Sequence, residues 1–264
     1  MKKIKYKNVN LTVILLLTVC FIGCTGVSAA VKNGEKKSDS PNVMLVARAQ
    51  SPINVDGTLD EPVWKKARVY KLHRAANRER SGKTVAQPGE VRLACDKDYF
   101  YVGVTFYDLD IIGEGKEDQL KHYKFGDICE LILTPENETW YWEMYATPAG
   151  KKSCFFIPGT ARVGLPSMME YKSELKVASK VNGTINDWRD KDVSWSAEMA
   201  VPVKELTAHG EKFGNGGGWR ILVARYNFGR YIDNESAELS MTPQLSVENF
   251  HILSEFAILK FDDK

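Results

Sequence analysis

Several residue types are scarce in this 264-residue sequence, and each scarcity excludes a class of protein. No charge is in excess, since 36 basic residues face 34 acidic ones, and this balance argues against a nucleic-acid-binding protein. With 20 Gly, 10 Pro and no heptad repeat, the chain is neither collagen-like nor a coiled coil. A hydrophobic fraction of 44% can fill a core, which excludes a disordered chain. We therefore expect a globular protein with one domain of sandwich size or two smaller ones.

Cysteine is also scarce, with five in the whole chain. The three that follow residue 24 are Cys95, Cys129 and Cys154, and their spacing fits neither a zinc site nor a redox pair. Cys95 and Cys129 fall at apolar positions of expected strands, so we interpret them as buried small hydrophobic residues. A single disulfide that leaves one thiol free is the alternative in an oxidising compartment.

The sequence has one long apolar run, residues 11–23, which follows four lysines. This pattern predicts a signal peptide over residues 1–23, because the run is too short for a membrane span. Phe21-Ile22-Gly23-Cys24 resembles a lipobox, in which Cys24 becomes the lipidated N-terminus. Cleavage after Ala29 is the alternative, with a signal peptide of residues 1–29 and free secretion. We expect an exported protein, either a membrane-anchored lipoprotein that faces the periplasm or the cell surface, or a secreted protein.

Residues 24–50 are mostly polar and predict a flexible linker, although residues 43–47 suit a first strand. Over residues 51–264, apolar and polar positions alternate in short runs that are typical of strands. No helices alternate with these runs, so we predict an all-β fold: an antiparallel β-sandwich, immunoglobulin-like or jelly-roll-like, with one or two short helices. The expected strands are residues 91–95, 99–107, 128–134, 139–147, 153–157, 171–181, 194–201, 219–228 and 256–261, and residues 203–206 suggest a helical turn.

Six short motifs follow one another between residues 50 and 262. They are INVDGTLDEPVWKKA (53–67), ACDKDYFYV (94–102), GDICELIL (126–133), WEMYATPAG (142–150), WSAEMAVPVKEL (195–206) and FHILSEF (250–256). In this order they resemble the family 9 carbohydrate-binding modules. The resemblance implies a β-sandwich and non-catalytic binding of plant or algal polysaccharide or oligosaccharide, including chain ends, outside the cytoplasm. It also implies extracellular glycoside hydrolases as partners, with no nucleic acid and no membrane contact other than a lipid anchor.

The first of these motifs also has a structural interpretation. Asp56-Gly57 suits a turn, and Asp60 suits the N-cap of a short helix with Pro62 in its first turn. Trp64 then points inward. We therefore expect this motif to support the fold and not to bind a ligand.

The resemblance implies a sugar site with two clamping aromatic rings and a Glu that bonds sugar hydroxyls. Phe250 falls at the aromatic position of the closing motif, and Glu130 falls at the position of the Glu. Lys124 stands where the family has Trp, so the flanking Tyr123 or Phe125 would have to serve as the second ring. The alternative for Phe250 is a place in the core.

Further polar candidates lie near these positions. Asp127 precedes Glu130 by three residues, Tyr145 falls where well-known family members have Arg, and Asn249 lies next to Phe250. Because residues alternate between strand faces, Glu130 lies opposite the core face of its strand and need not be buried. The alternative is that Glu130 and Asp127 pair with Lys121, Lys124 or Arg225 as framework charges.

Three other functions remain open alongside carbohydrate binding, one of which, a haem-binding electron-transfer sandwich of related shape, would need a Met/His axial pair. A carbohydrate-active enzyme would need paired carboxylates that flank the scissile bond, and Asp127, Glu130 and Glu143 offer carboxylates. A degenerate sandwich that docks onto another protein is the second alternative. Family members often carry structural Ca²⁺, for which Asp108 and Asp110 are candidates, and a plain acidic loop is the simpler interpretation.

Overall fold

The computed structural model of the protein describes residues 42–162, 164–232 and 235–262. These residues belong to one compact unit, Ser38–Lys264, which is distinct from Met1–Lys37. The predicted signal peptide, its cleavage sites and Cys24 lie outside the described residues. In the part of the chain that is described, no helix is long and apolar enough to cross a membrane.

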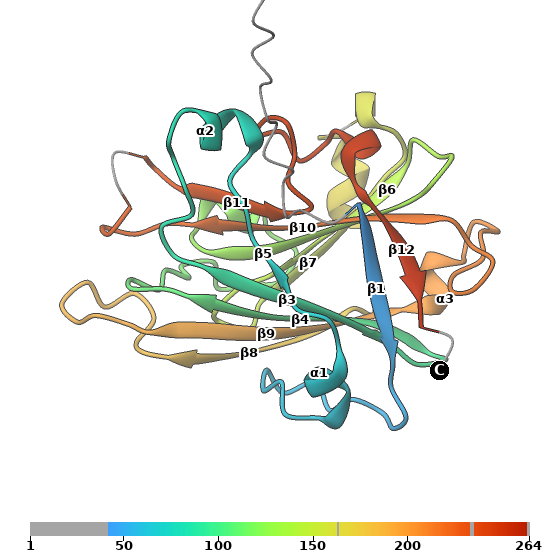
Figure 1. Cartoon of the computed structure of the whole chain (residues 1–264), viewed down its shortest axis with the longest axis horizontal. Coiled ribbons are helices and arrows are strands. Elements are labelled where there is room, and N and C mark those ends of the chain that lie inside the picture. The colour runs from blue at the N-terminus through green and yellow to red at the C-terminus, as the bar shows by residue number, and fades with distance from the viewer. Residues whose placement is uncertain (1–41, 163, 233–234, 263–264) are drawn as a thin grey trace, which may run out of the picture. The chain divides into compact units, whose positions relative to one another are not determined.

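The described residues form two stacked β-sheets, which confirms the predicted all-β sandwich (Figure 1). Strand β10 lies at the centre of the first sheet, sheet A. Strand β5 pairs with one edge of β10, and β11 and β12 share its other edge. Sheet A contains β5 (Ile128–Pro135), β6 (Tyr141–Ala146), β7 (Lys152–Ile157), β10 (Trp219–Asn227), β11 (Glu238–Thr242) and β12 (Ala257–Phe261).

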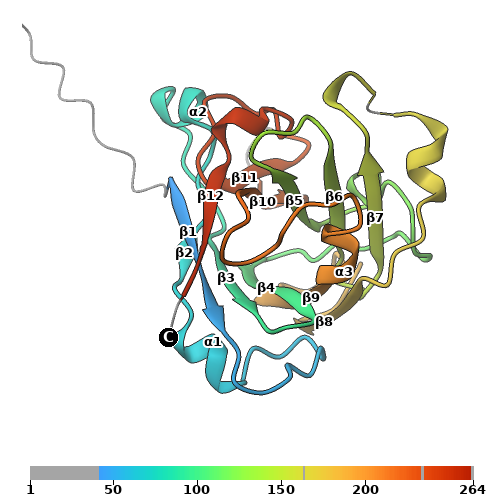
Figure 2. The same ribbon diagram turned by 90° about the vertical axis from the view of Figure 1, so that its right-hand side faces the viewer.

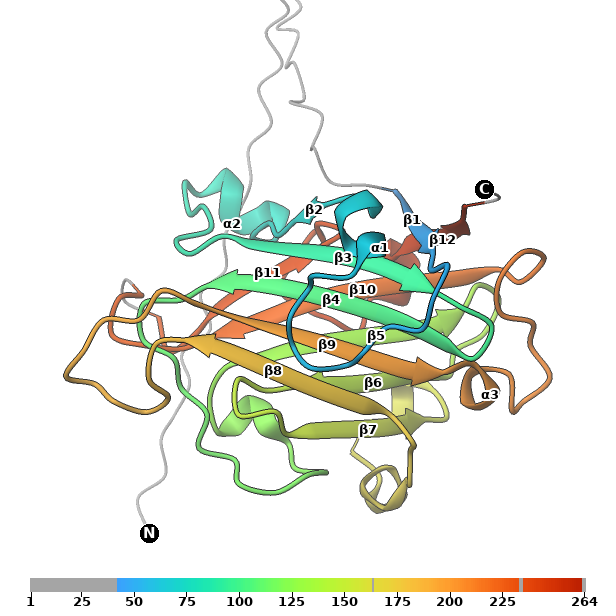
Figure 3. The ribbon, with the colours of Figure 1, turned by 90° about the horizontal axis from the view of Figure 1, so that it is seen from below.

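The second sheet, sheet B, is antiparallel and has the order β2-β3-β4-β9-β8 (Figure 3). Its strands are β2 (Tyr70–Lys71), β3 (Gly89–Cys95), β4 (Tyr99–Tyr107), β8 (Lys176–Asn182) and β9 (Ser194–Pro202).

Strand β1 (Val43–Arg48) joins the two sheets. Its first four residues pair in parallel with β12 of sheet A, and its last two pair in parallel with β3 of sheet B (Figure 2). These parallel pairings depart from the purely antiparallel sandwich that the sequence predicts. Because β1 lies within the predicted linker, the folded unit begins ahead of the expected boundary at residue 51.

The helices are short: α1 (Pro62–Lys66), α2 (Ala76–Arg80) and α3 (Val203–Leu206). The expected helical turn at residues 203–206 is α3, whereas α2 and the short strands β2 and β11 were not predicted from the sequence. Each of these unpredicted elements has five residues or fewer, which is too short to show a clear periodicity.

The main core fills the space between the sheets. Trp142 stacks on Trp219 within sheet A, and Phe106 packs edge-to-face on Trp195 within sheet B. All four side chains belong to this core and are buried. Cys95, Cys129 and Cys154 are buried and free in the described part of the chain, as expected for small hydrophobic residues. The outer face of sheet A carries a second core, because later segments of the chain fold over it.

The opening motif covers the outer face of sheet B (Figure 3). One carboxylate oxygen of Glu198 accepts hydrogen bonds from the backbone N–H groups of Asp56 and Gly57, each at 2.9 Å. The other oxygen accepts from Trp64 Nε1 at 2.9 Å. The motif is therefore structural, although helix α1 begins at Pro62 with Glu61, not Asp60, at its N-cap.

Candidate functional site

A pocket of about 230 Å³ opens on the outer face of sheet A, away from sheet B. Residues 164–170 and 243–256, yellow and red in Figure 1, stand on this side of the sheet and cover part of it. The pocket lies between these covering segments and the sheet. Its lining residues are Lys121, Tyr123, Glu130, Glu143, Tyr145, Gly164, Met168, Tyr226 and His251.

The strand register places three of these side chains together. Glu130 on β5 lies directly opposite Tyr145 on β6, and Ile132 lies opposite Glu143. Because alternate residues of a strand share a face, Glu130, Glu143 and Tyr145 all point to the outer side of sheet A. Directly opposed side chains lie about 5 Å apart at Cβ, so these polar groups form one cluster.

The cluster contains two buried carboxyl groups with different surroundings. Glu143 is 5% exposed, accepts a hydrogen bond from the Tyr145 hydroxyl and feels the charge of Lys121. Glu130 is 2% exposed, and its Oε2 atom has no hydrogen-bond partner within the described residues. Glu130 lies on the outer face of β5, as predicted, but it is buried because the segments that cover sheet A close over that face.

Burial raises the pKa of Glu130 well above the usual range, and the nearby charge of Glu143 raises it further. Burial also raises the pKa of Glu143, although the Tyr145 hydroxyl and Lys121 oppose this shift. The Glu130–Glu143 pair therefore retains a proton at pH values where an exposed carboxyl group has lost its proton.

Aromatic rings form a wall of the pocket. Tyr123 lies 5.9 Å from Tyr226 and 6.3 Å from Tyr145, measured between ring centroids. Burial and the two Glu side chains raise the pKa of all three phenols, so the hydroxyls remain protonated and can donate hydrogen bonds. His251 Nδ1 lies 2.8 Å from the Tyr141 hydroxyl, and burial lowers the pKa of the His251 ring, which favours its neutral form.

Three of the residues predicted from the sequence lie in this pocket: Glu130, Tyr123 and Tyr145. Phe250 lies behind the wall, 4% exposed, with its ring edge-to-face against Tyr226 at 5.6 Å. Phe125 is 40% exposed and lies outside the pocket lining. Of the two aromatic residues that flank Lys124, the structure therefore brings Tyr123 to the site.

Two other predicted residues support the backbone. Asp127 is buried, and its two oxygens accept hydrogen bonds from the N–H groups of Phe228 at 2.6 Å and Ile112 at 2.7 Å. Asn249 is exposed, and its side-chain oxygen accepts from the N–H of His251 at 3.1 Å. Asp127 therefore has a structural role, but its hydrogen-bond partners are backbone N–H groups and not the cationic side chains of the framework alternative. Asn249 orients the chain beside the pocket.

Three lining residues, Tyr226, His251 and Lys121, were not predicted as site residues from the sequence. Tyr226 could have been found, because it continues the outer-face alternation of Leu222 and Ala224 on β10. His251 follows Phe250 in the closing motif, so the side chain next to the expected aromatic residue is the one that reaches the pocket.

The two candidate calcium ligands already have protein partners. Asp108 accepts hydrogen bonds from Arg225 Nη2 at 2.8 Å and Trp195 Nε1 at 3.2 Å, and its other oxygen accepts from the N–H of Asp110. Asp110 accepts from the N–H of Arg230 at 2.9 Å. Within the described ranges, no group of three or more His, Cys, Asp or Glu side chains is placed to hold a metal ion.

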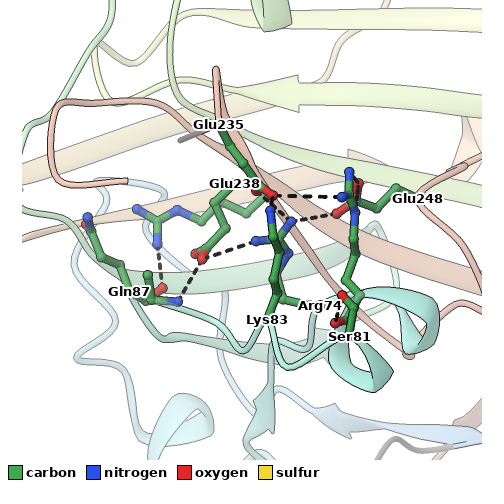
Figure 4. A network of polar contacts seen from close by, with 10 residues as sticks. Arg74, Ser81, Lys83, Gln87, Glu235, Glu238 and Glu248 are labelled. Atoms are coloured by element: carbon green, nitrogen blue, oxygen red, sulfur yellow. Dashed lines mark hydrogen bonds and ion pairs between the residues drawn. The ribbon is translucent and has the colours of Figure 1, made fainter. Parts of the chain in front are cut away.

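A second hollow of about 490 Å³ adjoins the pocket and shares Tyr123 and Tyr226 with it. A cluster of ion pairs, drawn in Figure 4, lies beside this hollow and holds helix α2 to sheet A. Arg74 donates to Glu235 at 2.8 Å and to Glu248 at 2.7 Å, and Arg78 also donates to Glu248. Paired charges of this kind fix the wall of the hollow.

The strand order defines the molecule as a two-sheet β-sandwich, and comparison with solved structures narrows the fold further. The structure of a proposed carbohydrate-binding protein from Bacteroides uniformis is similar, with a TM-score of 0.61 and 15% sequence identity. The match covers 84% of this chain and 100% of the Bacteroides chain. A family 9 carbohydrate-binding module from Caldicellulosiruptor kristjanssonii, in complex with glucose, matches 84% of this chain and 96% of its own, with a TM-score of 0.54 and 13% identity.

A structure of a family 9 module from the same organism with cellotriose matches with a TM-score of 0.53 and 13% identity, over 84% of this chain and 94% of its own. No family model and no curated protein matches the sequence. The protein therefore has the fold of the family 9 carbohydrate-binding modules, as the sequence motifs predict.

Proposed function

We propose that the protein binds carbohydrate without transforming it and holds one sugar ring in the pocket on sheet A. The observation that carries this proposal is the combination of tyrosine rings with a buried carboxyl oxygen, Glu130 Oε2, that has no partner among the described residues. Aromatic faces pack against the C–H groups of a sugar, and polar groups fix its hydroxyls. The ligands of the two solved family 9 structures, glucose and cellotriose, support the same class of ligand.

The dimensions of the site favour the end of a chain. A volume of about 230 Å³ lies below the range of roughly 300–1,000 Å³ of sites for drug-sized ligands, and it suits a single ring. The adjoining hollow, which shares Tyr123 and Tyr226, offers room for the next units. We infer that the ligand is an oligosaccharide or the end of a plant or algal polysaccharide.

Glycoside hydrolysis is the second candidate, because two carboxyl groups lie in one pocket. A glycosidase places its acid and its base or nucleophile on either side of the scissile bond. Glu130 and Glu143 instead come from paired strands on one face of sheet A, and Glu143 is bonded to Tyr145. This arrangement favours binding, with any part in polysaccharide breakdown exerted through partner glycoside hydrolases.

The location of the protein remains part of the proposal. We infer export, with Cys24 as the lipidated residue of a membrane-anchored lipoprotein, or free secretion as the alternative. The family resemblance also implies a structural Ca²⁺ ion, although Asp108 and Asp110 already have protein partners. If such an ion is bound, EDTA should lower the melting temperature of the protein. Labelling of cells with a radioactive fatty acid, compared between the natural chain and Cys24→Ser, tests the anchor.

The binding proposal is tested by calorimetric titration of residues 38–264 with glucose, xylose, cellobiose and xylobiose, then with a broader glycan panel, with and without Ca²⁺. We expect saturable binding that Tyr226→Ala weakens. In a parallel assay, the concentration of reducing sugar should stay at the level found with buffer alone. Absence of binding across the panel would contradict the proposal and favour a protein-docking sandwich, and release of reducing sugar would favour an enzyme.

A further inference from the structure

The pocket contains more negative than positive ionisable groups. Glu130 and Glu143 both line it, and Lys121 is the cationic side chain among the described lining residues. The charge of Lys121 stabilises the ionised form of Glu143, and Glu143 also accepts a hydrogen bond from the Tyr145 hydroxyl. Neither group stabilises the ionised form of Glu130. A positively charged ligand can therefore stabilise the ionised form of Glu130, which Lys121 and the Tyr145 hydroxyl do not.

The aromatic rings add to this preference. Tyr123, Tyr145 and Tyr226 surround the same space as the carboxyl groups, and the face of an aromatic ring attracts a cation. The ammonium group of Lys124 already lies 5.8 Å from the ring centroid of Tyr123. Rings and carboxyl groups that enclose one small volume together favour a ligand cation over a neutral hydroxyl group.

We propose that the pocket selects an amino sugar, whose ammonium group donates a hydrogen bond to Glu130 Oε2 and lies among the tyrosine rings. This inference rests on the proposed function, because it names the class of sugar that the same pocket takes. A charge-assisted hydrogen bond is roughly twice as strong as a neutral one, so the amino sugar gains affinity over its hydroxyl counterpart.

The proton of the carboxyl pair provides an independent signature. Before a ligand binds, Glu130 and Glu143 together retain a proton. An ammonium group binds only the ionised carboxylate. Binding of an amino sugar therefore releases this proton to the buffer, whereas a neutral sugar leaves it in place. The other titratable groups around Glu130 are Cys129 beside it in the chain and, around the pocket, Lys121, Tyr123, Tyr141, Tyr145, Tyr226 and His251.

The test is calorimetric titration of residues 38–264 with glucosamine, galactosamine, glucose, galactose, N-acetylglucosamine and N-acetylgalactosamine; the amide of the last two is neutral. We expect one of the amino sugars to bind at least tenfold more tightly than both its hydroxyl and its acetylated counterpart at pH 7. Repeating the titration in two buffers of different ionisation enthalpy measures the released protons. Glu130→Gln should remove both the preference and the proton release, whereas Glu138→Gln, an exposed Glu between β5 and β6, should keep them.

Each other outcome has a distinct meaning. If amino and neutral sugars bind equally, this inference is wrong and the proposed function stands. If no sugar binds, both fail. Displacement of glucosamine by CaCl₂ would assign the carboxyl pair to a metal ion and overturn the inference. Should Glu130→Gln fail to fold by circular dichroism, the comparison of glucosamine with N-acetylglucosamine on the unaltered protein still decides.

Discussion

Glu130→Gln should change how the stability of the protein depends on pH. In the folded protein, burial and the charge of Glu143 raise the pKa of Glu130 well above its usual range. In the unfolded chain the same group titrates near its ordinary pKa of about 4.3. Above that pH the folded state holds more protons than the unfolded state, so the free energy of unfolding falls as the pH rises, up to the folded pKa. One proton of difference corresponds to a slope of about 1.4 kcal/mol per pH unit.

Glutamine does not ionise, so the variant should lose this contribution to the slope. The free energy of unfolding of Glu130→Gln, relative to that of the natural protein, should increase by up to about 1.4 kcal/mol for each pH unit above about pH 5. This increase should stop at the pKa that Glu130 has in the folded protein. Urea unfolding at pH 5, 6, 7 and 8 gives the difference in the free energy of unfolding between the two proteins. It is calculated from the urea midpoints, provided that the m-values agree. The control variant Glu138→Gln should run parallel to the natural protein. A Glu130→Gln curve that is also parallel would show that Glu130 ionises like an exposed carboxyl group, and our account of the pocket would be refuted.

Tyr123→Ala should weaken sugar binding at least tenfold and Phe125→Ala should leave it unchanged, because Tyr123 lines the pocket and Phe125 does not; equal calorimetric losses would contradict this assignment. Phe250→Ala should lower the free energy of unfolding by about 3–5 kcal/mol, while Phe250→Leu keeps the sugar affinity within about threefold. A selective loss of affinity in a folded Phe250→Leu variant would place Phe250 against the sugar. Glu198→Ala leaves three N–H donors without their acceptor and should cost about 3 kcal/mol in denaturant unfolding with unchanged sugar affinity. A Glu198→Ala variant as stable as the natural protein would show that the opening motif is held by other contacts.

The longer strands, such as β4 and β5, were predictable from alternation because each of them buries one face in the main core. The apolar set of residues 99–107, with Phe100 and Phe106 at its ends, is the inner face of β4, and Glu130 falls on the outer face of β5 as expected. The burial of Glu130 was not predictable. It depends on residues 164–170 and 243–256, which pack on sheet A although they follow or precede its strands as separate loop segments.

The identity of the aromatic wall was only partly predictable. Position in a motif singles out Phe250, but the packing of the closing segment turns Phe250 toward Tyr226 and places His251 at the pocket. Tyr123 and Phe125 are equivalent in sequence terms because both flank Lys124. The 3₁₀ turn His122–Lys124 separates them, with Tyr123 facing sheet A and Phe125 facing solvent.

The double pairing of β1 has a mechanical consequence. The first residues of β1 are hydrogen-bonded to β12 of sheet A, and the last are hydrogen-bonded to β3 of sheet B. One short strand is therefore attached to both sheets. When the chain ahead of Val43 is pulled along the axis of β1, the hydrogen bonds to both neighbours are loaded together in shear and do not open one after another. A protein held by its N-terminal side while its pocket grips a polymer would therefore carry the tension through both layers of the sandwich.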